Sequence, residues 1–335
     1  MRATTSFPAF VCPRCRGPLS STPDAYACAP CAVTYPVILG IPDFRVEPDP
    51  WISLEDDRAK AIRLHDATTA LDMAGSVDAY WAMTPGTPPA QARRFTEYVL
   101  EGEQRAAEFL DAIGAEDAAP AAPWLEIGCA SGDLLAAAAD RAIPVVGVDV
   151  ALRWLVIARH RPALATGAQR LVCANGEHLP FADGVFARVV SLGTLEHCRR
   201  AETVLSESAR VLRDGGAVNM RTTNRYSLLP EPHVHVWGVG FLPRRWADAY
   251  VRWRSGQRYL HHRPLSRGEL AVALRRAGFT QIRVDAARLL PGDRRRLGRL
   301  AAILGPLYTL ARTIPVVASL LSRIAPLLDL SSRTP

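Results

Sequence analysis

One run of residues constrains the fold of this chain more than any other. Trp124-Leu-Glu-Ile-Gly-Cys-Ala-Ser-Gly-Asp133 is typical of a buried strand followed by a glycine-rich turn that opens a helix. A second apolar strand follows from Ile143 to Val150, and another helix begins near Leu152. Strand, glycine-rich turn, helix and strand form the first half of a doubly wound parallel sheet. We therefore predict an α/β fold with a ligand site where these strands end.

The turn after the first strand distinguishes between two classes of nucleotide cofactor. A dinucleotide site needs G-x-G-x-x-G so that a pyrophosphate can lie at the helix N-terminus. Here Gly128 and Gly132 are separated by three residues, and Ala130 stands where another glycine would fall. Glu126 adds a carboxylate, which repels pyrophosphate but suits a ligand with an ammonium and a sulfonium. Asp149 ends the second strand, where a carboxylate can accept both hydroxyls of a ribose. The residues favour S-adenosylmethionine over NAD.

With Asp149, the run from Trp124 to Asp133 resembles the class I S-adenosylmethionine-dependent methyltransferases of the methyltransferase type 11-like kind. Three later segments, in the right order, are similar to this family's third strand, its fourth strand and the turn before its fifth strand. They are Cys173-Ala-Asn-Gly-Glu-His-Leu-Pro-Phe-Ala-Asp183, Val189-Val-Ser-Leu-Gly-Thr-Leu-Glu-His197 and Val211-Leu-Arg-Asp-Gly-Gly-Ala-Val218. The resemblance spans about residues 90–290 and implies a Rossmann-like, doubly wound, seven-stranded methyltransferase sheet.

The resemblance also implies which residues hold the cofactor. Asn175 stands where the family commonly has an acid that meets the adenine amino group, and its side-chain oxygen can still accept that hydrogen bond. Ala130 would be strained if the turn requires a positive φ there. The expected contacts run from the methionine part through ribose and adenine to the reactive end: Glu126, Gly128, Cys129, Gly132, Asp149, Val150, Asn175, Gly176, Ser191 and Leu192.

The acceptor side is less defined, because methyl transfer needs mainly positioning, and a base only if the acceptor carries a proton. Glu196 and His197 follow the fourth strand, and His233 and His235 lie in an unusual loop, 221–237, after the fifth. We take these four as candidate catalytic residues. The alternative is that they hydrogen-bond the backbone or pack the loop. A metal on an E-x-x-E-H motif is disfavoured, because Gly193 occupies its first position.

Two CxxC pairs near the N-terminus, twelve residues apart, predict a metal site: Cys12, Cys15, Cys28 and Cys31. Four thiolates leave no open position, so we expect a structural zinc whose binding supplies folding energy. Four unrelated buried or redox cysteines are the alternative. Residues 10–44 resemble the small zinc-ribbon activator subunit of tRNA and protein methyltransferases, which implies an accessory or docking role.

We expect four parts: a zinc ribbon over 1–48, a linker with short helices over 49–89, a class I methyltransferase domain over 90–290, and a basic, apolar helical tail over 291–335. The net charge of +7 is concentrated in residues 243–263 and 288–335, so an anionic partner would bind there. The tail's apolar runs are shorter than the roughly 20 residues that span a bilayer. Peripheral membrane contact through 294–330 is one interpretation, and packing on the domain or on a second subunit is the other.

These observations predict an enzyme that transfers methyl groups from S-adenosylmethionine to a small-molecule or lipid- or saccharide-linked acceptor. One alternative is an rRNA or tRNA methyltransferase, although the chain lacks the N-P-P-[FYW] motif of many enzymes that methylate base nitrogens. Another is a non-catalytic cofactor-binding adaptor. Seven cysteines and an N-terminus without the apolar run of a secretory signal predict a cytoplasmic protein, with a peripheral position at the inner membrane face as an extension.

Overall fold

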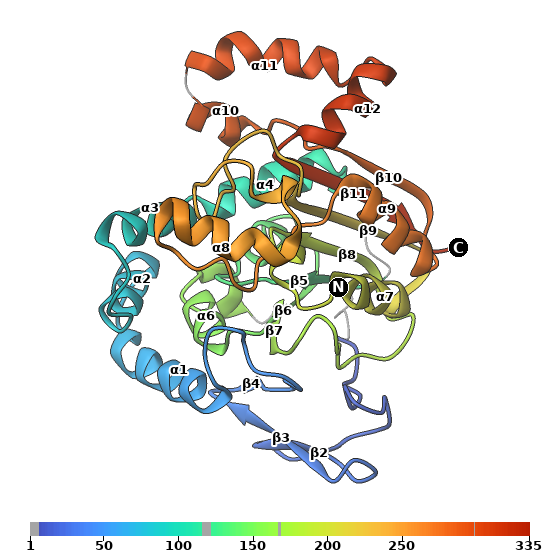
Figure 1. The fold of residues 1–335 in the computed structure, drawn as a ribbon. Helices are drawn as coiled ribbons and strands as arrows, with labels where there is room; N and C mark the ends of the chain where they lie inside the picture. The colour runs from blue at the N-terminus through green and yellow to red at the C-terminus, as the bar shows by residue number, and fades with distance from the viewer. Residues whose placement is uncertain (1–6, 116–121, 167–168, 298) are drawn as a thin grey trace. The chain divides into compact units, whose positions relative to one another are not determined.

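A computed structural model describes residues 7–115, 122–166, 169–297 and 299–335 (Figure 1). It contains a seven-stranded sheet of order β10-β11-β9-β8-β5-β6-β7, which confirms the predicted Rossmann-like sheet. In that order the strands are Thr280–Ala286, Leu327–Arg333, Leu212–Thr223, Phe186–Leu192, Trp124–Ile127, Val145–Asp149 and Gln169–Cys173. The chain divides into two compact units, Met1–Arg188 and Val189–Pro335.

The first unit contains the parallel strands β5, β6 and β7, with Leu125 opposite Val146 and Val148 opposite Val172. All four residues of β5 are buried, as a parallel strand covered on both faces requires. The helices α5 (Asp133–Ala139) and α6 (Leu152–Ala158) follow β5 and β6 and are rich in buried Ala and Leu. Gly147 lets α5 approach closely, because a Cβ there would lie 2.8 Å from atoms of Cys129 and Leu135.

Four helices precede β5, and two of them occupy the segment expected to be a linker with short helices. They are α1 (Leu54–Thr68), α2 (Met73–Ala82), α3 (Pro89–Leu100) and α4 (Gly102–Ala112). Side chains of Ser53 and Asp72 cap α1 and α2 by accepting backbone N–H groups. Glu101 separates α3 from α4. Gly102 lets the start of α4 lie close to the Asp133 carboxylate, because a Cβ at Gly102 would be only 1.7 Å from a carboxylate oxygen.

The N-terminal segment forms an antiparallel sheet of its own: β1 (Ser20–Ser21), β2 (Ala25–Cys28), β3 (Val33–Ile38) and β4 (Ile41–Pro42). The chain after β4 then joins the edge of the large sheet. Asp43 forms a parallel bridge with Cys173 of β7, and the Phe44 N–H donates to the Cys173 carbonyl at 2.7 Å. Backbone hydrogen bonds therefore attach this segment to the β7 edge.

An aromatic cluster extends this attachment into the core. Phe44 is fully buried, and its ring centroid lies 4.9 Å from that of Phe10, 5.1 Å from Tyr26 and 5.3 Å from Tyr35. Phe10 also contacts Phe181, which follows β7, at 5.8 Å. The N-terminal segment and the rest of the first unit consequently share one apolar core.

A network of buried charged side chains also connects the N-terminal segment to the rest of the first unit. The Arg45 guanidinium donates to Asp43 at 2.7 Å, to Asp57 of α1 at 2.6 Å and to the Val150 carbonyl at 3.0 Å. Asp57 also accepts from Arg153 at 2.6 Å. The side chains of Arg45, Asp43 and Asp57 are entirely inaccessible to solvent. Buried charges are tolerated when each is paired and hydrogen-bonded, as they are here, and this network joins the N-terminal segment to the end of β6.

In the second unit, β11 lies between β9 and β10 and is antiparallel to both, with Leu330 opposite Met220 and Val284. Its helices include α7 (Ala201–Val211), α8 (Arg244–Ser255) and α9 (Arg267–Arg276). Ser266 and Glu269 form a capping box at the start of α9. The aromatic residues of α8 divide: Tyr250 packs on a buried cluster that includes Val251, whereas Trp253 is 77% exposed.

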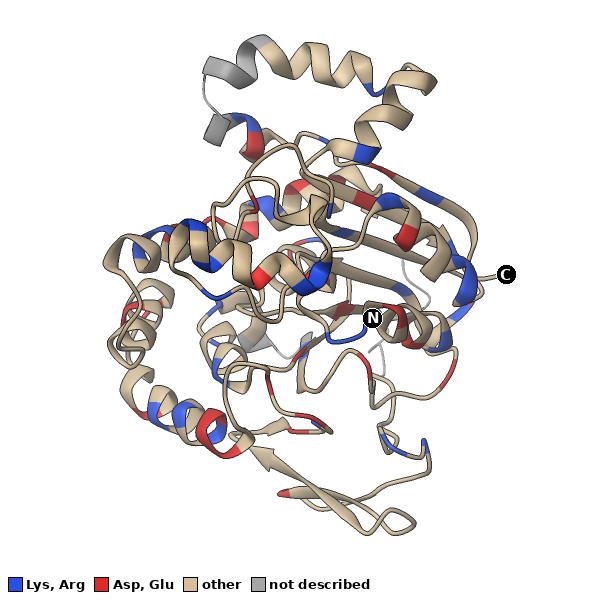
Figure 2. Ribbon diagram, viewed as in Figure 1, with Lys and Arg blue, Asp and Glu red and all other residues tan. Residues whose placement is uncertain are grey.

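The helical tail is present as α10 (Pro291–Leu297), α11 (Arg299–Ala311) and α12 (Pro315–Ile324), but its last residues form the strand β11, which we did not expect. In the chain, the three helices therefore connect two strands of the sheet, β10 and β11. Residues 304–324 carry few charges (Figure 2), and Leu307 and Val316 are 62% and 81% exposed.

Among the described residues, no single helix is long and apolar enough to span a membrane. One pair of helical segments reaches that length and apolarity together, Leu304–Ala311 of α11 and Pro315–Ile324 of α12, but the pair is bent by 113°. The expected membrane contact through 294–330 stays a prediction.

Replacing Arg45 tests whether the buried network holds the first unit together. Arg45→Met leaves Asp43 and Asp57 buried with fewer partners, so we expect it to lower the free energy of unfolding by about 3–5 kcal/mol. The control is Arg58→Met, because Arg58 binds the same Asp43 from a partly exposed position and should cost about 1 kcal/mol or less. Urea unfolding measures both. Equal losses in the two variants would contradict a structural role for the network.

Candidate functional site

The turn after β5 has the left-handed backbone that its glycines predict. Gly128, Ala130 and Gly132 have φ values of 79°, 40° and 73°. The N–H groups of Gly128 and Cys129 both donate to the Val148 carbonyl, at 2.7 and 3.1 Å, so the turn bends toward the end of β6. Ala130 is the one residue of the three with a side chain, and this conformation costs about 1 kcal/mol there. The turn thus presents backbone rather than side chains to a ligand.

Asp149 connects the two strand ends. One carboxylate oxygen accepts the N–H of Ala130 and the other accepts the N–H of Ala151, each at 2.8 Å. A carboxylate oxygen has two lone pairs, so each can accept one further hydrogen bond. Burial raises the pKa of Asp149 to about 6, and the two backbone N–H groups offset part of that rise. The side chain can therefore receive two hydroxyl groups of a ligand.

Glu126 is the most unusual residue of this region. It is 3% exposed, and its buried Oε2 atom has no hydrogen-bond partner within the part of the chain that the structure describes. Burial raises the pKa of Glu126 well above its usual range, and the carboxylates of Asp133 and Asp149 raise it further. An unpaired buried carboxylate oxygen is costly, and a cationic group of a ligand would relieve that cost. The arrangement of Glu126, Asp149 and the turn fits a ligand with an ammonium and a ribose.

Arg161 fixes the beginning of α5 next to this site. Its guanidinium donates to the Ser131 carbonyl at 2.7 Å and to the Val99 carbonyl at 3.1 Å, and it forms an ion pair with Asp133. These bonds hold the turn against α3, so the backbone of the site is set before any ligand binds.

The other expected cofactor residues lie in different surroundings. Cys129 is buried in the turn. The Asn175 side chain accepts the N–H groups of Val46 and Glu47, at 2.9 and 3.1 Å, and donates to the Glu47 carbonyl at 3.1 Å. These bonds tie the chain after β4 to the end of β7, so Asn175 already has partners in the protein.

Two further cofactor candidates belong to the first unit. They are Val150, which follows β6, and Gly176, which follows Asn175. The Val150 carbonyl accepts from Arg45, a residue that no motif singled out. Ser191 and Leu192 end β8 within the second unit.

The four N-terminal cysteines come together as their spacing predicts. All four Sγ atoms lie within 4.8 Å of one another, with Cys12 and Cys31 at 3.9 Å and Cys15 and Cys28 at 3.5 Å. Tetrahedral zinc with bonds of about 2.3 Å places its sulfur ligands about 3.8 Å apart. The group is therefore suited to hold one metal ion.

In the second unit, two of the four expected catalytic residues meet. His197 ends a 3₁₀ turn after β8 (Leu195–His197) and His233 lies in the loop after β9, with ring centroids 4.7 Å apart. His262, which sequence analysis missed, joins them at 4.3 Å from His233 and 5.1 Å from His197. His235 is exposed and has a φ of 54°.

Glu196 is buried away from any such role. Its carboxylate accepts the hydroxyl groups of Thr222 and Thr223, both at 2.7 Å, and the Thr223 N–H at 3.2 Å. This is the structural corner given above as the alternative for this residue. Glu231 lies instead beside the histidines, and its Oε1 is 2.6 Å from Nδ1 of His233.

The electrostatics of the histidine cluster follow from this arrangement. Burial would lower the pKa of His233, but the hydrogen bond with Glu231 and the charges of Glu231 and Glu196 raise it overall. Burial lowers the pKa of His262 to about 3, and the neighbouring His233 and His197 add to that effect. His262 is therefore a neutral imidazole at any physiological pH.

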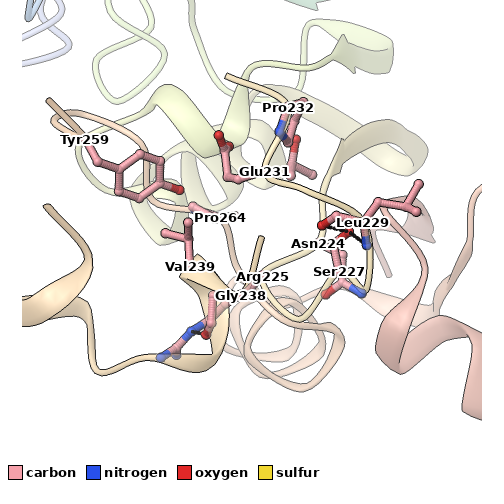
Figure 3. A pocket seen from close by; sticks show the side chains of 12 residues that line it. Asn224, Arg225, Ser227, Leu229, Glu231, Pro232, Gly238, Val239, Tyr259 and Pro264 are labelled. Atoms are coloured by element: carbon pink, nitrogen blue, oxygen red, sulfur yellow. Dashed lines mark hydrogen bonds between the residues drawn. The ribbon is translucent and has the colours of Figure 1, made fainter. Parts of the chain in front are cut away.

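A pocket of the second unit is lined in part by two residues that contact these histidines, Glu231 and Tyr259. Figure 3 shows Glu231 and Tyr259 on one side of the pocket and Asn224, Ser227 and Leu229 on the other. The Tyr259 ring also stacks on His262, with centroids 5.4 Å apart. The pocket and the histidines are thus parts of one local structure.

Comparison with known proteins covers the middle of the chain. Residues 125–220 match the methyltransferase domain family. Malonyl-[acyl-carrier protein] O-methyltransferase of Methylococcus capsulatus is 29% identical over 177 residues, which cover 52% of this chain and 57% of that protein. The mitochondrial 2-methoxy-6-polyprenyl-1,4-benzoquinol methylase of Leishmania donovani is 36% identical over 120 residues, covering 34% and 40%.

Among solved structures, geranyl diphosphate C-methyltransferase of Streptomyces coelicolor has a TM-score of 0.45 at 16% identity, covering 69% of this chain and 76% of that one. The chain spans just over half the length of the first two curated relatives. The matched residues 125–220 extend from β5 to β9 and include the turn, Asp149 and Glu196.

Proposed function

We propose that this protein transfers a methyl group from S-adenosylmethionine to a small-molecule acceptor. The observation that carries the proposal is the buried, unpartnered Oε2 atom of Glu126. It interacts electrostatically with Asp149, so one region can bind both an ammonium and a ribose. The match of residues 125–220 to the methyltransferase domain family supports the same cofactor. The names of the relatives, a malonyl-carrier methyltransferase and a benzoquinol methylase, support a small acceptor.

Glu126, Asp149 and the turn after β5 each have a separate role in this proposal. Glu126 holds the ammonium, Asp149 accepts the ribose hydroxyls, and the left-handed turn from Gly128 to Gly132 lets the backbone approach the ligand. The bound cofactor supplies a methyl carbon that its sulfonium has already activated. The protein then needs mainly to position the acceptor and exclude water.

We further propose that the four cysteines hold a structural zinc ion. Their Sγ separations fit a tetrahedral site. The segment they fold carries Arg45 and the backbone groups that bind Asn175. We infer that this zinc ribbon supports the cofactor site from the β7 side, which gives it the accessory role that its resemblance to an activator subunit implies.

Glu126→Gln tests the ammonium contact. The variant keeps the shape but removes the charge, so we expect affinity for S-adenosylhomocysteine to fall about 10- to 100-fold, or about 1.5–3 kcal/mol. Adenosine lacks the α-ammonium of the amino-acid part, so its affinity should not change. Glu97→Gln, on the exposed surface of α3, is the matched control. Isothermal titration measures all three, and an absence of binding to folded wild-type protein would refute the proposed function.

Asp149 predicts a pH dependence for binding of the ribose. Its pKa of about 6 in the free protein means that the carboxylate is protonated below this pH, whereas the hydroxyls bind the ionised form. The affinity for adenosine should therefore be constant above pH 6 and fall toward tenfold per pH unit below it. Asp149→Asn should bind weakly at every pH. Equilibrium dialysis with labelled adenosine measures this, and a wild-type affinity that rises on acidification would contradict the assignment.

Removing the metal tests the link between the ribbon and the cofactor site. Chelation should unfold residues 10–44, because so small a segment lacks a sufficient core without its metal. We expect the affinity for S-adenosylhomocysteine to fall about tenfold, since Arg45 and the Val46 and Glu47 backbone lose their fixed positions. Hydrogen exchange follows the ribbon while titration follows the affinity. A ribbon that unfolds with no change in affinity would show that the two are independent, as the cysteine pattern alone suggests.

A further inference from the structure

We propose that His197, His233 and His262 bind a divalent transition-metal ion at a site separate from the four cysteines. The three residues come from separate parts of the second unit: the 3₁₀ turn after β8, the loop after β9 and the segment before α9. One ring nitrogen of each lies within 4.8 Å of the others. Neither the matched family nor the names of the relatives assigns a metal here, and the inference stands whether or not the chain transfers methyl groups.

The distances require only a small contraction. Metal–nitrogen bonds of about 2.1 Å place the ligand atoms roughly 3 Å apart, so each imidazole needs to move by about 1 Å. The three histidines are half-buried rather than packed in the core, and rotation about their side-chain bonds supplies such a movement. The first requirement of a three-histidine site, convergence of the rings, is therefore met.

Glu231 supplies the outer support that metal-binding histidines usually have. Its Oε1 lies 2.6 Å from Nδ1 of His233, and its Oε2 accepts the N–H groups of His233 and Val234 at 2.8 and 3.0 Å. The carboxylate favours the tautomer with hydrogen on Nδ1, which leaves the Nε2 lone pair available for a metal. A carboxylate bound to the far nitrogen also makes the imidazole a stronger ligand.

The segments that carry the histidines are joined to one another. The Arg263 N–H donates to the Glu196 carbonyl at 2.6 Å, so the residues after His262 and before His197 are directly bonded. Tyr259 stacks on His262, and its own N–H is held by Asp248 at 2.7 Å. The spacing of the three rings is thus set by the fold rather than by a chance approach of side chains.

The ligand set indicates which ion would bind. Three neutral imidazoles suit Zn²⁺ and Co²⁺ and are poorly matched to Mg²⁺ or Ca²⁺, which prefer oxygen. Three protein ligands leave a coordination position open. An anionic oxygen of a small molecule would suit this open position, because oxygen ligands bind Zn²⁺ as well.

This site differs from the E-x-x-E-H arrangement that the sequence disfavours. Gly193 has no side chain to offer, and the Glu196 carboxylate is already bound by Thr222 and Thr223. Its charge remains close enough to affect His233. Glu196 and Glu231 therefore supply negative potential for a cation without serving as ligands.

Metal stoichiometry tests the proposal on the full chain with the cysteine site filled. After equilibration with micromolar free Zn²⁺ and gel filtration, we expect two equivalents of zinc in the wild-type protein and one in His262→Ala and in His197→Ala. The matched control is His261→Asn, whose exposed residue adjoins His262 and has a φ of 62°, a conformation that Asn tolerates; it should retain two. Circular dichroism verifies that each variant is folded. If one alanine variant does not fold, the other still tests the proposal.

Cobalt distinguishes the two sites by their ligands. The full chain, with zinc in its cysteine site, is titrated with Co²⁺. Cobalt bound by the histidines should give ligand-field absorption without the thiolate-to-cobalt charge-transfer band that cysteine ligands produce. Both alanine variants should lose this ligand-field absorption. One equivalent of zinc in folded wild-type protein, or equal zinc contents in wild type and both alanine variants, would overturn the proposal. A cobalt spectrum with thiolate bands alone would do the same.

Discussion

The carboxylate of Asp149 orders the strand ends that we propose as the cofactor site. It accepts one backbone N–H from the turn after β5 and one from the residue after β6, so a single side chain joins the ends of two parallel strands. The carboxyl ends of adjacent parallel strands are where open α/β sheets bind ligands. The residue that orders the turn is therefore also the one that we propose binds the ribose hydroxyls. Glu126, in the preceding strand, is also buried, and its Oε2 atom has no hydrogen-bond partner among the described residues.

The N-terminal ribbon is part of the first unit rather than an appended module. Two cysteine pairs and a few short strands cannot form an apolar core of useful size, and here Phe44 packs against Phe10 and two tyrosines while Phe10 reaches Phe181. The chain then continues along the β7 edge into a charge network that ends on the Val150 carbonyl. Edge pairing and ion pairing thus act on one continuous structure that reaches the end of β6, and the proposed metal ion would stabilise the same structure.

Local signals in the sequence were sufficient for much of this fold. The glycines of the turn, the aspartate that ends β6 and the capping box at Ser266 depend on residues close together in the chain, so their geometry follows from local rules. The CxxC spacing likewise predicts convergence of four thiolates. What these features share is that one short segment contains both the cause and its structural result.

Features that depend on distant pairing were not predictable in this way. Strand β11 is a short segment whose place between β9 and β10 is decided by partners about 45 to 110 residues away. Asn175 stays a predicted ligand contact, but nothing in its own segment indicates that its side chain also binds Val46 and Glu47. His262 was missed for the same reason, since it meets His197 and His233 only when three segments fold together.

A crystal structure with bound S-adenosylhomocysteine is the most direct test of the central claim. The account predicts that the ligand amine lies within hydrogen-bond distance of the Glu126 carboxylate, and that the ribose hydroxyls donate to Asp149. A ligand bound elsewhere, or one whose amine avoids a Glu126 that remains unpaired, would contradict it.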